Sequence, residues 1–280
     1  MSAGFARRFI AGESMEETVA PVRALNGRGV TASLDYLGEN VTRAEQAAES
    51  VTYYHRLLRF IADNRLDANI SLKLTQLGFD IDPALAEANM RDILADAATY
   101  EQFVRIDMEG SAYTQRTLDL FHALWPDFRN TGVVIQSYLY RSEKDVEKLI
   151  EIGARVRLCK GAYSEPREVA FQDKSDVDAN YLRLMRRLLK DGNYPAIATH
   201  DELMIEGTES YAKEQGIGPD RFEFQMLYGI RRDRQESLVR DGYRMRVYVP
   251  FGTQWYGYMM RRLAERPANL WFVMKNLLRR

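Results

Sequence analysis

Eight short segments rich in β-branched and aromatic residues recur along this 280-residue chain, and each is followed by a stretch with helical character. Segments of this composition, bounded by Gly, Pro, Asn or Asp, are typical of strands. Eight successive strand–helix units favour a (β/α)8 barrel, with an open doubly wound sheet as the alternative. No GxGxxG motif follows the first segment, which weakens that alternative. The predicted strands are 30–36, 69–75, 103–109, 133–138, 155–160, 195–199, 222–228 and 245–249.

A short helix is predicted before the first strand. Ser14 and Glu17 have the spacing of a capping box, in which the two side chains bond each other's backbone amides. A second capping box starts at Thr42 and predicts the helix after the first strand. We therefore divide the chain into an N-terminal helical extension over residues 1–29 and a barrel over residues 30–280.

The charge balance and the cysteine content exclude several classes of protein. The 39 basic and 40 acidic side chains give a formal net charge of −1, whereas nucleic-acid-binding proteins usually have a basic excess. The one cysteine, Cys159, excludes an internal disulfide and fits a reducing compartment, so we expect a cytoplasmic protein. No stretch is long and apolar enough to span a membrane, and the first residues have no continuous apolar core, unlike a secretory signal.

Polar residues gather at the predicted carboxyl ends of the strands, where barrels of this type have their active sites. Lys73 is flanked by two leucines within its strand, so it points into the barrel lumen. A lumen lysine must pair or shift its pKa, and Asp107 on the next strand is the expected partner. The same pair is also consistent with a purely structural role. The other polar residues at strand ends are Thr75, Glu109, Gln136, Arg157, Lys160, Thr199, His200, Glu223, Gln225, Tyr228 and Tyr248.

Arg157 and Lys160 precede Gly161, and two cations beside a flexible turn suit a phosphate or pyrophosphate. An ion pair between strands is the alternative. His200 is the only histidine at a strand end, and a lone histidine does not make the usual metal site, so no metal is expected. Cys159 lies within a strand, as an inert core thiol would.

The last predicted strand leads into a helix with a distinctive polar face. Tyr258, Arg261, Arg262 and Glu265 fall at i, i+3, i+4 and i+7, so they share one side of that helix. Guanidinium groups bind carboxylates bidentately, which indicates a site for a small carboxylate. A solvated polar stripe on a surface helix is the alternative.

Together these residues resemble the proline dehydrogenases, flavoenzymes that oxidise L-proline, and in particular their monofunctional bacterial branch. The resemblance covers residues 34–268 and is specific in the combination of KGAY with the final YxxRRxxE. It implies a distorted (β/α)8 barrel whose last helix lies over the carboxyl mouth. One departure is Ser164, where bifunctional members have Trp near the adenine. The matching stretches are SLKL at 71–74, RIDME at 105–109, VIQSY at 134–138, RLCKGAY at 157–163, ATH at 198–200, FEFQMLYG at 222–229, YVPFGT at 248–253 and YMMRRLAE at 258–265.

The resemblance also implies roles for individual residues, with FAD as cofactor and L-proline as substrate. It implies that Glu39 pairs with Arg261 and gates the site. The implied catalytic residues are Asp107, Arg157 and Lys73. The implied substrate-binding residues are Lys73, Leu227, Tyr248, Tyr258, Arg261 and Arg262. The implied cofactor-binding residues are Met108, Gln136, Arg157, Lys160, Gly161, Ala162, Tyr163, Thr199 and His200.

The expected reaction is oxidation of L-proline to 1-pyrroline-5-carboxylate, the first step of proline catabolism to glutamate. Hydride would pass to the flavin and electrons then to a membrane quinone, with peripheral contact to the inner membrane. Two rival hypotheses use the same residues. One is a Schiff-base lyase or aldolase with Lys73 or Lys160 as nucleophile. The other is a non-catalytic barrel that binds a small acid through Arg261 and Arg262.

Overall fold

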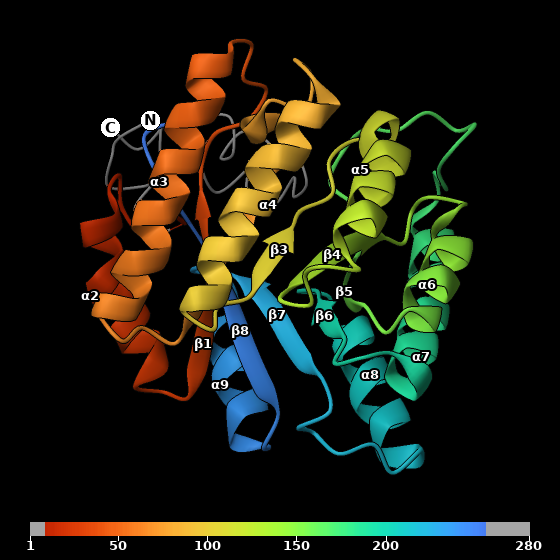
Figure 1. Ribbon diagram of the computed structural model, residues 1–280. Helices are drawn as coiled ribbons and strands as arrows, with labels where there is room; N and C mark the ends of the chain where they lie inside the picture. The colour runs from red at the N-terminus through yellow and green to blue at the C-terminus, as the bar shows by residue number, and fades with distance from the viewer. Residues whose placement is uncertain (1–8, 256–280) are drawn as a thin grey trace, which may run out of the picture.

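A computed structural model describes residues 9–255 of the chain. Within that range eight strands form one closed parallel barrel, in which each strand pairs with the next along the chain and β8 pairs with β1 (Figure 1). The predicted (β/α)8 barrel is therefore confirmed, and each predicted strand overlaps an observed one. The strands are β1 Val30–Tyr36, β2 Ala68–Leu72, β3 Val104–Ile106, β4 Thr131–Gln136, β5 Arg155–Cys159, β6 Ala196–Ala198, β7 Glu223–Leu227 and β8 Arg244–Phe251.

Helices follow the strands and lie on the outside of the barrel (Figure 1). In the described part of the chain, helix α2 precedes β1 and a short 3-10 helix follows β2. The helical elements are α2 Met15–Asn26, α3 Ala44–Asp63, η1 Leu74–Leu77, α4 Pro83–Thr99, α5 Ser111–Leu124, α6 Ser142–Glu151, α7 Lys174–Asp191, α8 Glu202–Glu214 and α9 Arg232–Arg240.

The capping box predicted at Thr42 is wrong. Helix α3 begins at Ala44 with Arg43 at its N-cap, and no side-chain bond caps it there. The backbone N–H of Thr42 instead donates to Oε1 of Gln46 at 3.1 Å, so the neighbouring glutamine takes the part predicted for Glu45. Both residues could reach the start of the helix, and the sequence alone did not distinguish them.

The segment before β1 packs on the barrel rather than apart from it. The backbone N–H of Ala11 donates to the carbonyl of Pro250, and that of Gly252 donates to the carbonyl of Gly12, both at 3.0 Å. Helix α2 buries Val22 in the same hydrophobic core as the barrel strands. The described part of the N-terminal extension thus adds apolar burial beside the paired strands β1 and β8.

Alternation along the strands separates an apolar outer layer from a polar lumen. Leu34 and Leu72 are fully buried beneath the helices. Ser33, Asp35 and Ser71 alternate with them and therefore face the lumen. Burying a leucine side chain contributes about 2 kcal/mol to the stability of the folded state. Because these leucines must face the helices, the polar residues that alternate with them must face the lumen.

Candidate active site

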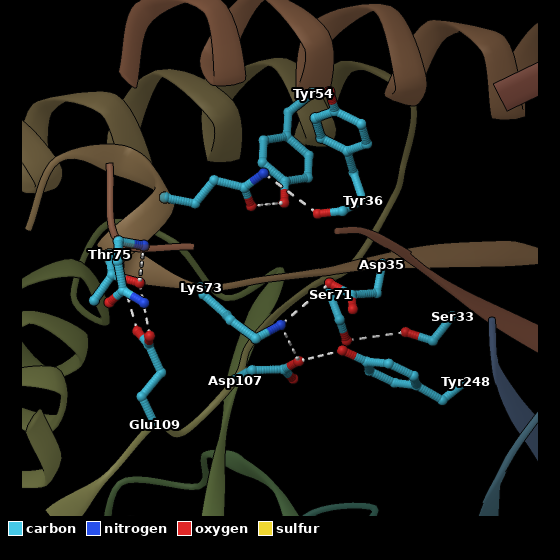
Figure 2. Close-up of polar contacts among 12 residues, drawn as sticks. Ser33, Asp35, Tyr36, Tyr54, Ser71, Lys73, Thr75, Asp107, Glu109 and Tyr248 are labelled. Carbon is cyan, nitrogen blue, oxygen red and sulfur yellow. Dashed lines mark hydrogen bonds and ion pairs between the residues drawn. The ribbon is translucent and has the colours of Figure 1, made fainter. Parts of the chain in front are cut away.

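Lys73 directly follows β2, and its ammonium lies in the barrel interior between two carboxylates (Figure 2). Its Nζ is 3.4 Å from Oδ1 of Asp35 and 3.9 Å from Oδ2 of Asp107. The exposed fractions of Lys73, Asp35 and Asp107 are 9%, 1% and 9%. The lumen therefore contains a buried cation that is compensated from β1 and from the end of β3.

Asp107 links this cation to a second one. Its Oδ1 accepts a hydrogen bond from Arg157 at 2.8 Å, and its Oδ2 accepts one from the Tyr248 hydroxyl at 2.6 Å. Arg157 also donates to Oγ of Ser71 at 3.1 Å, and Ser71 is hydrogen-bonded to Ser33 at 3.1 Å. The Arg157 guanidinium lies 5.3 Å from the centre of the Tyr248 ring, within cation–π range. Side chains from five strands thus form one connected polar cluster.

Burial and neighbouring charges both shift the pKa values of the groups in this cluster. Burial lowers the pKa of Lys73, but the charges of Asp35 and Asp107 outweigh it, so the pKa is raised above its ordinary value. Burial raises the pKa of Asp35, and Lys73 opposes that rise. Burial and the charge of Asp107 raise the pKa of Tyr248, which remains a hydroxyl donor. At neutral pH the lumen therefore has a charged lysine and a neutral phenol.

The predicted partner of Lys73 is Asp107, and the structure shows that Asp35 is nearer and is the one hydrogen-bonded to it. Asp35 is absent from the predicted site. The signal that could have found it is alternation in β1, which puts Asp35 on the lumen face. Asp35 is in register with Ser71, two residues before Lys73 on β2, so the two charged side chains meet.

A second charged cluster lies at the end of β5. Lys160 forms ion pairs with Asp178 and, at 2.7 Å, with Asp201. Lys174, the first residue of α7, contacts the same two carboxylates. Burial raises the pKa of Asp201, but hydrogen bonds from Lys160 and Lys174 outweigh this and lower it to about 2. Lys160, like Arg157, is thus engaged in the ion pairing that the sequence left open as an alternative, while both also line the cavity described below.

Gly161 shapes the loop that follows β5. Its φ of +122° is rarely adopted by residues with side chains, and a Cβ there would lie 2.5 Å from atoms of the Tyr138 ring. The Tyr138 hydroxyl in turn donates to Glu165 at 3.3 Å. Glu165 also accepts from the backbone N–H of Ser111, at the start of α5, at 2.7 Å. The loop is therefore supported from below by an aromatic ring and anchored to a neighbouring helix.

His200 is fixed by the strand beside it. Its Nε2 accepts a hydrogen bond from the backbone N–H of Leu227 at 2.8 Å. A nitrogen that accepts carries no proton, so a neutral ring has its proton on Nδ1. Gln136, at the end of β4, donates through Nε2 to the carbonyl of Glu109 at 3.3 Å.

These groups line a cavity of about 490 Å³ at the carboxyl ends of the strands. Pockets for small molecules and cofactors commonly have volumes of about 300–1,000 Å³. Asp35, Lys174 and Asp201 line it and were not predicted. Every residue within 9–255 that was predicted to be catalytic or to bind substrate or cofactor lines it as well: Lys73, Asp107, Met108, Gln136, Arg157, Lys160, Gly161, Ala162, Tyr163, Thr199, His200, Leu227 and Tyr248.

Three predicted substrate residues, Tyr258, Arg261 and Arg262, lie outside the described residues. Among residues 9–255, no group of His, Cys, Asp or Glu side chains is arranged to hold a metal ion. None of the helices in that part of the chain combines the length and apolarity needed to traverse a bilayer.

A charged lumen cluster and a ligand-sized cavity at the carboxyl ends of eight parallel strands define a (β/α)8 barrel with the layout of an enzyme. The sequence pattern of the family described as proline dehydrogenase matches residues 18–275. The chain belongs to the proline dehydrogenase family and is an oxidoreductase.

Curated relatives and a solved structure agree with this assignment. Proline dehydrogenase 2 of Bacillus subtilis is 47% identical over 272 residues, which cover 97% of this chain and 90% of the relative. The proline dehydrogenase of Deinococcus radiodurans is 42% identical over 279 residues, with coverages of 98% and 90%. The crystal structure of proline utilization A from Bdellovibrio bacteriovorus has a TM-score of 0.87 and 28% identity. It matches 93% of this chain, which spans 32% of that longer protein.

Proposed function

We propose that this protein oxidises L-proline to 1-pyrroline-5-carboxylate with FAD as its cofactor. The observation that carries the proposal is that one cavity is lined both by the Lys73–Asp107–Arg157–Tyr248 cluster and by the loop over residues 160–163. The first cluster suits a small anionic substrate, and the loop suits a phosphate-bearing cofactor. Membership of the proline dehydrogenase family supports proline as the first of these ligands and a flavin as the second.

The described residues fit a flavin nucleotide. Oε1 of Gln136 and Nε of Arg157 are buried polar atoms with no hydrogen-bond partner among residues 9–255, and a flavin ring edge offers both donors and acceptors. Gly161 has no side chain to keep a ligand away from its backbone. Lys160 supplies a cation for the phosphates. When bound, FAD supplies the two-electron acceptor. The residues proposed to hold it are Met108, Gln136, Arg157, Lys160, Gly161, Ala162, Tyr163, Thr199 and His200.

The Lys73 ammonium binds the substrate carboxylate in this proposal, together with Arg261 and Arg262 of the final helix. Leu227 and Tyr248 contact the proline ring, and Tyr258 joins them from the same helix. An apolar ring surface and a separate cationic end match the two halves of the substrate. Binding both halves fixes the carbon beside the ring nitrogen at one place in the cavity.

Asp107, Arg157 and Lys73 are the proposed catalytic residues. Asp107 holds the Tyr248 hydroxyl and the Arg157 guanidinium in place by the two short hydrogen bonds described above. Hydride leaves the carbon beside the nitrogen most easily when the amine is neutral, because the nitrogen lone pair then forms the C=N bond of the product. The buried walls of the cavity exclude water from that step.

A membrane quinone is the proposed final electron acceptor, reached by a protein that lies in the cytoplasm and contacts the inner membrane peripherally. This part of the proposal rests on the resemblance to the family. Anaerobic mixing of the proline-reduced protein with quinone-containing lipid vesicles tests it. Reoxidation of the flavin is expected with these vesicles but not with vesicles that lack quinone.

The decisive experiment is a visible absorption spectrum of the purified protein before and after anaerobic addition of L-proline. A flavin spectrum that bleaches on addition supports the proposal. A colourless protein that cannot be loaded with FAD contradicts it.

The two rival hypotheses give different outcomes. A Schiff-base enzyme would form a covalent adduct at a lysine with substrate and borohydride, visible by mass spectrometry. The structure disfavours Lys73 as such a nucleophile, because attack needs a neutral amine and two carboxylates keep this one charged. A non-catalytic binding barrel would bind proline analogues without reducing any flavin.

A further inference from the structure

We propose that Asp35 is a positioning residue for substrate binding, which holds the Lys73 ammonium charged and directed at the cavity from the β1 side. The proposal rests on the role proposed above for Lys73 in binding the substrate carboxylate. It assigns the two lumen carboxylates to different tasks, with Asp107 serving Arg157 and Tyr248 and with Asp35 serving Lys73.

The geometry of Asp35 is that of a dedicated partner. The side chain is 1% exposed and lines the cavity, and its Oδ1 is hydrogen-bonded to Nζ of Lys73 at 3.4 Å (Figure 2). Its Oδ2 is buried and has no hydrogen-bond partner within the described residues. A buried carboxylate is costly unless a cation compensates it. Asp35 therefore contributes through its charge and through its hydrogen bond with Lys73.

Asp107 is less well placed than Asp35 for this task. Each oxygen of Asp107 already accepts one hydrogen bond, from Arg157 at 2.8 Å and from Tyr248 at 2.6 Å. The Lys73 ammonium lies 3.9 Å from Asp107, beyond hydrogen-bond distance. Without Asp35, this longer ion pair is the one that Lys73 would keep among the described residues.

The charge of Asp35 opposes a large effect of burial on Lys73. Burial alone would lower the pKa of this lysine, and Asp35 is the first of the charged groups that raise it. Asparagine at position 35 keeps the shape and one acceptor oxygen but removes the charge. The pKa of Lys73 should then fall below its wild-type value, because burial would be opposed by fewer negative charges. The titratable groups that face Lys73 are Asp35 on β1, Glu39 after β1, Asp107 after β3, Glu109 after β3 and Tyr163 after β5.

The test is the pH dependence of binding of tetrahydrofuran-2-carboxylate, a proline analogue with oxygen in place of the ring nitrogen. This analogue has no group that titrates above pH 6, so any change in its affinity between pH 6 and pH 10 reports on the protein. Calorimetry on flavin-loaded protein measures the Kd without turnover. The wild-type Kd should change less than about twofold, whereas the Kd of Asp35→Asn should rise by up to about tenfold per pH unit once Lys73 loses its proton.

Two further variants identify the group that titrates. Asp35→Asn combined with Lys73→Arg should restore a flat profile, because arginine stays protonated in this range. Glu109→Gln is the matched control, since this buried acid bonds Thr75 rather than Lys73, and its profile should stay flat. A pH-dependent loss of affinity in the double variant would assign the titration to another group and overturn the proposal.

The outcomes separate this proposal from the proposed function. If flavin-loaded wild-type protein does not bind the analogue, the proposed substrate site fails. If the wild type binds and Asp35→Asn has the same profile and affinity, the positioning role fails. Should Asp35→Asn not fold, Asp35→Glu retains the charge but shifts the carboxylate. Asp35→Glu should weaken binding of the analogue without making its Kd depend on pH. Wild-type affinity in that variant would overturn the proposal.

Discussion

Replacing Gly161 by alanine should damage both the stability of the protein and its affinity for FAD. The added Cβ would lie 2.5–2.6 Å from three atoms of the Tyr138 ring, far inside van der Waals contact. The backbone at this position also has a φ of +122°, which an L-alanine rarely adopts. Neither problem can be solved by a small side-chain movement, because Tyr138 is buried and its hydroxyl is bonded to Glu165.

The expected free-energy cost of Gly161→Ala is the sum of two contributions. Backbone strain at a conformation that disfavours side chains costs about 1–3 kcal/mol. Overpacking a buried ring costs about 1–3 kcal/mol more. If the loop keeps its shape, the sum appears as lost stability of the flavin-free protein. If the loop moves instead, the cost appears as lost FAD affinity, at about tenfold for each 1.4 kcal/mol.

Two measurements distinguish lost stability from lost FAD affinity. Denaturant unfolding of the flavin-free protein gives the loss in free energy of unfolding, and quenching of flavin fluorescence gives the Kd for FAD. Gly153→Ala is the matched control, because Gly153 has a φ of +71° but nothing within 4 Å of an added Cβ. It should cost about 1–2 kcal/mol of stability and leave FAD binding unchanged. A Gly161→Ala protein that matches wild type in both measurements would refute the role assigned to this glycine.

Three further predictions concern the charged residues. Lys73→Ala should slow flavin reduction by proline, measured by stopped-flow absorbance, while FAD stays bound. Loss of the cofactor in this variant would show that the site is misassigned. Arg261→Met and Arg262→Met should each weaken proline binding by about 2–5 kcal/mol if the charges are desolvated, and unchanged apparent affinity would remove that role. The pKa of Asp201 is depressed from 3.8 to about 2 in the folded protein, so the stability that it contributes is present above pH 4 and is lost as the pH falls towards 2. Asp201→Asn should therefore show a shallower loss of unfolding free energy than wild type across that window, and parallel curves would contradict this.

The fold was predictable because alternation and composition report directly on how a strand is buried. The end of β2 was not, since the predicted strand runs to Thr75 whereas the observed strand stops at Leu72 and a 3-10 helix follows. Glu109 explains the difference. It accepts hydrogen bonds from both the backbone N–H and the hydroxyl of Thr75, at 3.3 and 2.6 Å, so that residue cannot continue the strand ladder. A contact between residues so far apart in sequence leaves no local pattern.

The site was predictable as a set of residues but not as a set of pairs. Strand ends and the KGAY motif locate the cavity lining, because the carboxyl ends of parallel strands meet at one end of a barrel. The partner of each charge depends on register and on side-chain reach. Asp35 rather than Asp107 is nearest to Lys73, and Lys174 joins Lys160 from a helix 14 positions along the chain. The two residues of the predicted phosphate-binding pair, Arg157 and Lys160, thus belong to separate charged clusters.

The charge balance of the lumen gives a physical reason to expect that Arg261 and Arg262 contribute to substrate binding. The charges of Lys73 and Arg157 are balanced by those of Asp35 and Asp107. This cluster can therefore orient an anion, but it has little net positive charge to attract one. Proline with a neutral amine, the form that loses hydride most easily, carries a charge of −1. The resemblance to the family pairs Arg261 with Glu39, which would leave the charge of Arg262 available to the substrate. That positive charge matches the substrate, and it predicts that Arg262→Met weakens proline binding more than Arg261→Met does.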